Sequence, residues 1–115
     1  MNTRVLVVDD EPSVLRLIRA VLARRGYAVD TAMTVEAALD ALGGRPPALL
    51  IVDVTLPDGN GFDVAEAATG SHPELPVLVI TGMVPHDPRA GRWPVLLKPF
   101  SVAYFGEVVT GLLKS

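Results

Sequence analysis

Five side chains capable of ionic or hydrogen-bonding chemistry stand directly after four short apolar segments. They are Asp9, Asp10, Asp53, Thr81 and Lys98, and the segments before them are residues 5–8, 48–52, 77–80 and 95–97. Three carboxylates, a hydroxyl and an ammonium group would suit a phosphoryl group bound beside a divalent cation, because metal and ammonium both neutralise phosphate charge. A carboxylate can also attack phosphorus itself and form an aspartyl phosphate.

The acidic residues of this set indicate a hard metal ion. Like charges that crowd together cost stability unless something neutralises them, and a divalent cation does so. The chain has no cysteine, and its two histidines, His72 and His86, lie in loops that carry proline, where a solvated side chain is the simpler expectation. A site made only of oxygen ligands favours Mg²⁺, which binds a few carboxylates and keeps several waters.

Each of the five residues also has a purely structural interpretation. Asp9 and Asp10 could cap a helix that begins directly after them, where negative charge is favourable. Asp53 could start a turn, Thr81 could be an ordinary strand residue, and Lys98 could pair with one acid and do nothing else. Packing alone, however, does not require four strands to end in complementary polar groups at the same edge.

The elements that must position these residues alternate along the chain. Apolar runs of strand length occur at 5–8, 27–32, 48–52, 77–80 and 95–97, and apolar residues recur at helical spacing within 14–22, 35–42, 62–69 and 102–113. Short apolar strands alternating with helices predict right-handed crossovers and a parallel sheet buried on both faces. Ligands bind such a sheet beyond the carboxyl ends of its strands, so we expect the five polar side chains to meet there.

The connection between the last two predicted strands departs from this alternation. Residues 82–94 include three prolines and two glycines. A full helix there would need proline in its interior, which removes a hydrogen bond and clashes with the preceding turn. We therefore expect a loop or one short turn in this segment.

Length and composition indicate one globular domain, residues 1–115, half of whose residues are hydrophobic. The longest apolar runs are far too short to span a bilayer, and the N-terminus lacks the basic region and long apolar stretch of a signal peptide. Together with the absence of cysteine, this favours a cytoplasmic protein without a membrane segment. A formal charge of −3, with several arginines spread along one helix, favours a solvated surface over direct nucleic-acid binding.

Four motifs together resemble those of the response-regulator receiver domain of two-component signalling. They are Val-Val-Asp-Asp-Glu-Pro at 7–12, Asp-Val-Thr-Leu-Pro-Asp-Gly-Asn-Gly at 53–61, Thr81-Gly82 and Lys98-Pro99-Phe100. Each motif is weak evidence alone, but their order and their placement at strand ends are specific, and the resemblance covers essentially the whole chain. It implies a doubly wound, flavodoxin-like α/β fold with five parallel strands in the order 2-1-3-4-5.

The resemblance implies separate roles for the acidic residues, as phosphoacceptor and as metal ligands. Asp53 would accept a phosphoryl group from a phosphohistidine on a sensor histidine kinase or a histidine phosphotransfer protein. Asp10, Asp53 and the backbone carbonyl of Thr55 would bind Mg²⁺ directly, and Asp9 would act through a coordinated water.

It also implies roles at the two later strand ends. Lys98 would contact the bound phosphoryl group, and the Lys98-Pro99 bond is expected to be cis, which X-Pro bonds alone adopt cheaply. Thr81 would hydrogen-bond the phosphoryl oxygen and report its arrival to the neighbouring loop, while Gly82 would leave room for the donor. Asp58 lies on the loop after Asp53 with no implied role, so we expect Asp58→Asn to accept a phosphoryl group normally.

Two positions depart from the family pattern. The family usually has Tyr or Phe three residues before the lysine, and this chain has Val95 there. The segment 82–94 is shorter than a full fourth helix requires, so that helix is expected to be short or absent. We therefore expect a phosphorylation signal to pass into this segment and the start of the last helix, around 100–104, with Trp93 as a reporter.

The function predicted from these features is phosphoacceptance in a two-component or phosphorelay system, by a signalling module rather than an enzyme. Since no residue follows Ser115, output by docking, by onward phosphotransfer or as a phosphate sink is expected, and a receiver cut from a hybrid kinase would look the same. Two alternatives remain open. One is a degenerate receiver that serves only as a binding module. The other is a small phosphatase resembling the haloacid dehalogenase group, whose second catalytic aspartate would stand where this chain has Thr55.

Overall fold

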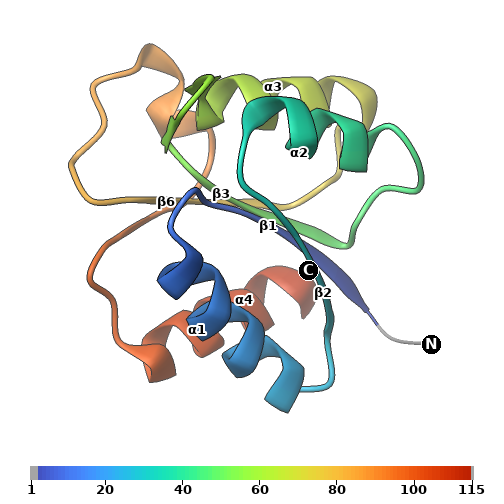
Figure 1. The fold of residues 1–115 in the computed structure, drawn as a ribbon, viewed down its shortest axis with the longest axis vertical. Helices are drawn as coiled ribbons and strands as arrows, with labels where there is room; N and C mark the ends of the chain where they lie inside the picture. The colour runs from blue at the N-terminus through green and yellow to red at the C-terminus, as the bar shows by residue number, and fades with distance from the viewer. Residues whose placement is uncertain (1–2, 115) are drawn as a thin grey trace.

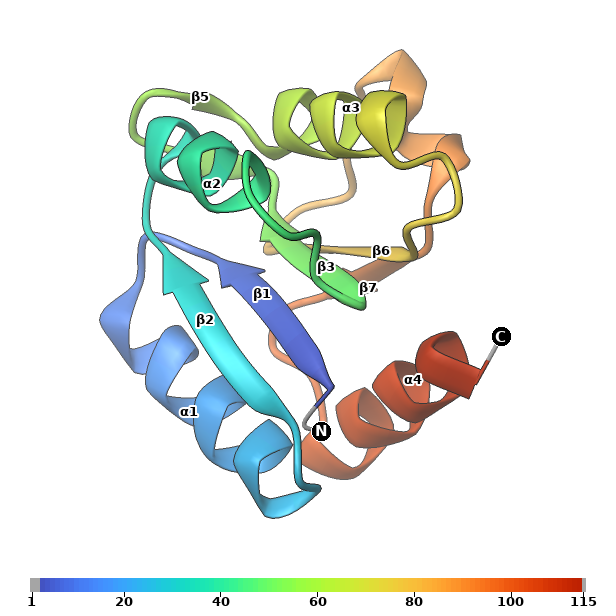
Figure 2. The same cartoon turned by 90° about the vertical axis from the view of Figure 1, so that its right-hand side faces the viewer.

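The structure is a computed structural model that describes residues 3–114, and its centre is a five-stranded parallel sheet with helices on both faces (Figures 1 and 2). The elements in chain order are β1 (Arg4–Val8), α1 (Pro12–Arg24), β2 (Ala28–Ala32), α2 (Val35–Leu42), β3 (Leu49–Asp53), β4 (Thr55–Leu56), β5 (Gly59–Asn60), α3 (Gly61–Ser71), β6 (Val77–Thr81), the 3-10 helix η1 (Pro88–Arg92), β7 (Val95–Leu97) and α4 (Val102–Lys114).

The strand order in the main sheet is β2-β1-β3-β6-β7, with every neighbouring pair parallel. This is the predicted order 2-1-3-4-5 when only the strands of the main sheet are counted, so the predicted fold is confirmed. Because the pairs are parallel and in register, β1, β3, β6 and β7 all end at the same edge. Chain segments that are far apart in sequence therefore deliver their next residues to one place.

The sheet separates two apolar layers. Successive strand residues point to opposite faces: Val5 and Val7 pack with the cluster under α1 and α4, while Leu6 and Val8 pack with the cluster under α2 and α3. Figure 1 shows the two helix pairs on opposite sides of the strands. Each fully buried Val or Leu stabilises the fold by roughly 1.5–3 kcal/mol through removal of apolar surface from water, which fixes the sheet rigidly beneath its polar edge.

Helix α3 and strand β3 extend beyond the residues predicted for them. The helix α3 runs from Gly61 to Ser71, past the predicted end at residue 69, so Gly70 does not stop it. Asn60 caps its start by accepting a hydrogen bond from the Phe62 N–H at 2.7 Å. Strand β3 includes Asp53 as its last residue, so the predicted phosphoacceptor is part of a buried strand and not of the loop that follows.

The end of α1 follows the expectation. Gly26 adopts a φ of +86°, a conformation that side chains with a Cβ rarely adopt, and it stops the helix. The Tyr27 N–H then donates to the Leu22 carbonyl at 3.1 Å, which keeps Tyr27 in the helix-ending turn, so strand β2 begins one residue later than predicted, at Ala28.

The connection between β6 and β7 contains one 3-10 turn, η1, where the prolines and the short spacing predicted a short or absent fourth helix, and this expectation is confirmed. The label α4 belongs to the C-terminal helix. In the described part of the chain, residues 3–114, no helix combines the length and apolar character that crossing a bilayer requires.

Candidate phosphoryl-acceptor site

The residues predicted to form a site lie at one edge of the sheet. Asp9 follows β1, Asp53 ends β3, Thr81 ends β6 and Lys98 follows β7. Asp9, Asp53 and Thr81 are the buried polar residues among those the structure describes, at 0%, 5% and 5% exposure. Burial of ionisable and polar side chains is costly unless they are paired, so this edge is a site and not an ordinary solvated surface.

Lys98 is the centre of the charge arrangement. Its ammonium Nζ lies 2.7 Å from Asp53 Oδ2, 2.8 Å from Asp9 Oδ2 and 3.1 Å from Glu11 Oε1. The lysine side chain is only 14% exposed and thus largely shielded from water. Strand β7 therefore delivers one cation between the acids of β1 and β3, as the sequence predicted. The contact with Glu11 was not predicted, although the acidic run 9–11 contained the signal.

The carboxylates around this lysine form a donor set that fits Mg²⁺. One oxygen from each of Asp9, Asp10, Glu11 and Asp53 can be chosen so that all four lie within 4.8 Å of one another. When all are ionised, four carboxylates and one ammonium leave three negative charges, which favours a divalent cation. Oxygen-only donors are what Mg²⁺ prefers, and Thr55, whose carbonyl is the implied third protein ligand, begins β4 two residues after Asp53.

The ionisation of this cluster is shaped by burial and by pairing. Burial raises the pKa of the Asp9 carboxyl above its ordinary value, although the hydrogen bonds from Lys98 and from the Glu11 N–H act in the opposite direction. Burial alone would lower the pKa of Lys98, but its hydrogen bonds to Asp53 and Asp9 outweigh that effect and raise the pKa. Lys98 is therefore a permanent cation at neutral pH.

The loop after Asp53 folds back as a two-stranded hairpin, β4 with β5, that the sequence did not predict. The Thr55 N–H donates to Asp53 Oδ1 at 3.2 Å, and the Gly61 N–H donates to the Val54 carbonyl at 2.7 Å. A Cβ on Gly61 would collide with the backbone carbonyl of Asp53. Glycine at 61 thus permits the start of α3 to press against the end of β3.

Asp58, in the loop after Asp53, makes a tertiary contact. Its two carboxylate oxygens accept hydrogen bonds from the backbone N–H groups of Val35 at 2.7 Å and Glu36 at 3.1 Å, at the start of α2. These hydrogen bonds lower the pKa of the Asp58 carboxyl. The Asp58 side chain therefore joins the hairpin to a neighbouring helix, a contact that the sequence did not predict.

The end of β6 joins the site to the connection that follows it. The Thr81 carbonyl accepts from the Lys98 N–H at 2.8 Å, and its hydroxyl accepts from the Met83 N–H at 3.3 Å. A Cβ on Gly82 would meet no atom within 4 Å, so the space beside the site is open. The Lys98-Pro99 bond is cis, as the resemblance implied.

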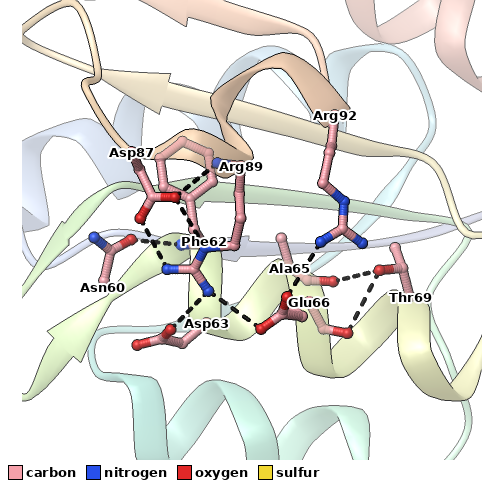
Figure 3. A network of polar contacts seen from close by, with 9 residues as sticks. All are labelled: Asn60, Phe62, Asp63, Ala65, Glu66, Thr69, Asp87, Arg89 and Arg92. Atoms are coloured by element: carbon pink, nitrogen blue, oxygen red, sulfur yellow. Dashed lines mark hydrogen bonds and ion pairs between the residues drawn. The ribbon is translucent and has the colours of Figure 1, made fainter.

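A network of ion pairs fastens the β6–β7 connection to α3 (Figure 3). The Arg89 guanidinium contacts Asp87 at 2.9 Å, Asp63 at 2.9 Å and Glu66 at 3.3 Å, and lies 5.8 Å from the centre of the Phe62 ring. Arg92 adds a second contact to Glu66 at 3.2 Å. Electrostatic pairing thus holds this segment on α3.

Trp93 completes the same connection. Its ring stacks on Phe62 of α3 with 6.2 Å between ring centres, and the Arg92 guanidinium lies 4.5 Å from the centre of the indole. Val95, at the position of the missing aromatic, is half-buried and packs against the same apolar cluster as Trp93. The sole tryptophan therefore packs the connection onto α3, and its fluorescence should respond to movement of either element.

Comparison with known proteins decides the family. The model of the response regulator receiver domain matches residues 5–108. The chain belongs to the response-regulator receiver family. Receivers are signalling modules, which agrees with the site described above. Receiver domains bind Mg²⁺ at an acidic pocket, and the cluster of carboxylates around Lys98 fits such a pocket.

The relatives of this receiver are response regulators of bacteria and archaea. It is 39% identical over 108 residues to the transcriptional regulatory protein KdpE of Mycobacterium tuberculosis, a match that covers 90% of this chain and 47% of KdpE. The chain therefore spans about half the length of that relative. A CheY-like receiver from Methanospirillum hungatei superposes with a TM-score of 0.92 at 25% identity, covering 99% of this chain and 95% of that one.

One structural neighbour carries a phosphoryl mimic. The response regulator TrrA of Thermotoga maritima, solved in complex with Mg²⁺ and a beryllium fluoride, superposes with a TM-score of 0.88 at 29% identity. The match covers 97% of this receiver and 99% of TrrA. The overall arrangement of the receiver is thus shared with a protein that holds Mg²⁺ and a phosphoryl mimic together.

Proposed function

We propose that this receiver accepts a phosphoryl group on Asp53 in a reaction that depends on Mg²⁺. The observation that supports this most is the position of Lys98, whose ammonium lies 2.7 Å from Asp53 and 2.8 Å from Asp9 in a nearly buried cluster. A purely structural ion pair would need one acid. Three acids around one lysine leave negative charge that a cation and a phosphoryl group together can balance.

The transfer forms one bond and breaks one. An oxygen of the Asp53 carboxylate attacks phosphorus, a P–O bond forms, and the P–N bond of a phosphohistidine breaks, with its electron pair returning to the imidazole nitrogen. Lys98 is placed to contact the transferred phosphoryl oxygens, and it stays charged because its pKa is raised. Hydrolysis of the resulting acyl phosphate by water would end the signal.

The acids of the cluster have distinct tasks in this proposal. Asp10, Asp53 and the Thr55 carbonyl would bind Mg²⁺ directly, and Asp9, which pairs with Lys98, would act through a coordinated water. When bound, Mg²⁺ neutralises the charge that develops on the phosphoryl oxygens. The hydrogen bond from the Thr55 N–H to Asp53 fixes the acceptor carboxylate relative to the ligand loop.

The signal leaves through the end of β6. The Thr81 hydroxyl would donate a hydrogen bond to the phosphoryl oxygen. Without a phosphoryl group this hydroxyl accepts from the Met83 N–H, so its movement would displace the first residues of the β6–β7 connection. Arg89 and Trp93 hold the far half of that connection on α3. The output surface would be this connection and the start of α4, with no need for an aromatic switch at Val95.

The partners follow from the chemistry. A sensor histidine kinase or a histidine phosphotransfer protein supplies the phosphoryl group. Because such kinases take it from ATP, the reaction belongs in the cytoplasm. Output by docking to another protein or by onward phosphotransfer suits this domain, which itself has no direct contact with nucleic acid in the proposal.

Incubation with Mg²⁺ and acetyl phosphate tests the proposal without a partner. Acetate leaves as the P–O bond of the donor breaks, and intact-mass spectrometry should show one labile, hydroxylamine-sensitive phosphoryl adduct. No adduct on a folded protein at saturating Mg²⁺ would refute the proposed function.

A further inference from the structure

The tip of the β4–β5 hairpin is fastened to the start of α2. Asp58, in the turn of the hairpin, accepts from the N–H groups of Val35 and Glu36 at 2.7 and 3.1 Å. These donors are among the four N–H groups that a helix start leaves without an intrahelical partner. Thr34 already caps the same helix locally, by accepting from the Ala37 N–H at 3.0 Å. Asp58 therefore adds a contact across 22 or more residues of sequence to a helix that has its own cap.

The base of the hairpin is held separately. The Gly61 N–H donates to the Val54 carbonyl at 2.7 Å, and the Thr55 N–H donates to Asp53 at 3.2 Å. Thr55 pairs with Asn60 across the hairpin, so it lies between the held base and the tip that Asp58 fastens. Loss of the contact at the tip would leave the two short strands, of two residues each, held by the hydrogen bonds at the base and by the burial of Leu56, without the polar contact to α2.

We infer that Asp58 is a positioning residue for the Mg²⁺ site, acting through the hairpin that presents the backbone carbonyl of Thr55. This inference rests on the proposed function, which assigns that carbonyl to the ion. Asp58 is not itself a ligand, because both its oxygens are directed at α2. The physical basis is preorganisation: a ligand that is already held in place loses less conformational freedom when the ion binds.

The contact has the features of a maintained tether. The hydrogen bonds from Val35 and Glu36 lower the pKa of Asp58, so the carboxylate is ionised at neutral pH and interacts favourably with the positive end of α2. At the next position, a Cβ on Gly59 would come within 3.1 Å of the Val35 side chain, so the hairpin tip lies directly on the helix. Asp58 of the turn and the adjoining first residue of β5 thus lie against the same helix start.

Three variants separate positioning from simple helix capping. Asp58→Ala removes both tertiary hydrogen bonds, Asp58→Asn keeps one acceptor oxygen, and Thr34→Ala weakens the cap of α2 without touching the hairpin. Mg²⁺ affinity is measured by calorimetry and by amide-shift titration of the full chain. Hydrogen exchange of the Thr55 and Gly61 amides in metal-free protein provides a readout that does not involve the ion.

Asp58→Ala should weaken Mg²⁺ binding about tenfold, the lower end of what outer-shell partners of metal ligands contribute, and should speed exchange at Thr55. Asp58→Asn should lose less Mg²⁺ affinity than Asp58→Ala. Thr34→Ala should change the Mg²⁺ affinity by no more than about twofold, even if its Tm falls as much as that of Asp58→Ala. Should Asp58→Ala fail to fold, the comparison of Asp58→Asn with Thr34→Ala decides the question. Equal Mg²⁺ affinities for wild type and the Asp58 variants would overturn the inference alone, whereas a wild type without Mg²⁺ binding would overturn the proposed function.

Discussion

The guanidinium of Arg89 binds the carboxylate of Asp87 by two parallel hydrogen bonds, from Nε to Oδ1 at 3.0 Å and from Nη2 to Oδ2 at 2.9 Å. The same guanidinium reaches Asp63 and Glu66 of α3. Hydrogen bonds from the side chain and the backbone N–H of Arg89 lower the pKa of Asp87 to about 2. The β6–β7 connection is thus held on α3 by charge.

This pairing predicts a pH-dependent effect of Asp87→Asn on stability. The pKa of Asp87 in the fold is below its ordinary value of 3.8, so the ionised carboxylate stabilises the fold above about pH 4, and that contribution is lost as the pH falls toward 2. Asp87→Asn should therefore lower the Tm near neutral pH and match wild type in acid. Thermal unfolding at several pH values measures the difference. Asp40→Asn, at an exposed position of α2, is the control, and a Tm difference for Asp87→Asn that does not change with pH would argue against the pair.

Mg²⁺ should stabilise the fold through the acidic cluster. Because the ion binds the folded state, it should raise the free energy of unfolding by roughly 1–3 kcal/mol at concentrations well above its dissociation constant. Asp10→Ala should remove most of this response. The metal-free variant should be at least as stable as wild type, since one repulsive charge is gone. Differential scanning calorimetry with and without Mg²⁺ measures both quantities, and an undiminished Mg²⁺ response in Asp10→Ala would place the ion elsewhere.

Phosphorylation should be sensed by Trp93. Beryllofluoride with Mg²⁺, a mimic of the phosphoryl group, should change the Trp93 fluorescence and the amide shifts of residues 82–104, because Thr81 begins the connection in which Trp93 packs on Phe62. Thr81→Ala should weaken these changes and still allow phosphorylation of Asp53. Shift changes confined to residues beside Asp53 would show that this receiver stores or relays phosphate without changing shape.

The fold was predictable because each of its signals is local. Runs such as 77–80 are apolar enough to identify buried strands, and Gly26 marks a helix end by its own backbone conformation. The convergence of Asp9, Asp53 and Lys98 followed from parallel strand ends alone, and their hydrogen bonds confirm that these residues meet. A strand delivers its last residue to a fixed edge whatever the details of packing.

The parts that escaped prediction depend on contacts between distant residues. The tether from Asp58 to α2 joins positions 22 and 23 residues apart, and the short β4–β5 hairpin has no apolar pattern of its own. Helix α3 continues through Gly70 to Ser71, although the low helix propensity of glycine favours an earlier end. The contact of Glu11 with Lys98 was not predicted either, because it joins residues 87 positions apart and the acidic run 9–11 does not show which of its members the lysine reaches.

Labelling of Asp53 tests the central claim most directly. Wild type, Asp53→Asn and Asp40→Asn are incubated with acetyl phosphate and Mg²⁺, and the adduct is located by mass spectrometry after reductive trapping of the acyl phosphate. Wild type and Asp40→Asn should each carry one phosphoryl group on Asp53, only when Mg²⁺ is present, and Asp58→Asn should reach the same extent at saturating Mg²⁺. Asp53→Asn should carry none. Labelling of Asp53→Asn at the wild-type rate would contradict the assignment of Asp53 as the phosphoacceptor.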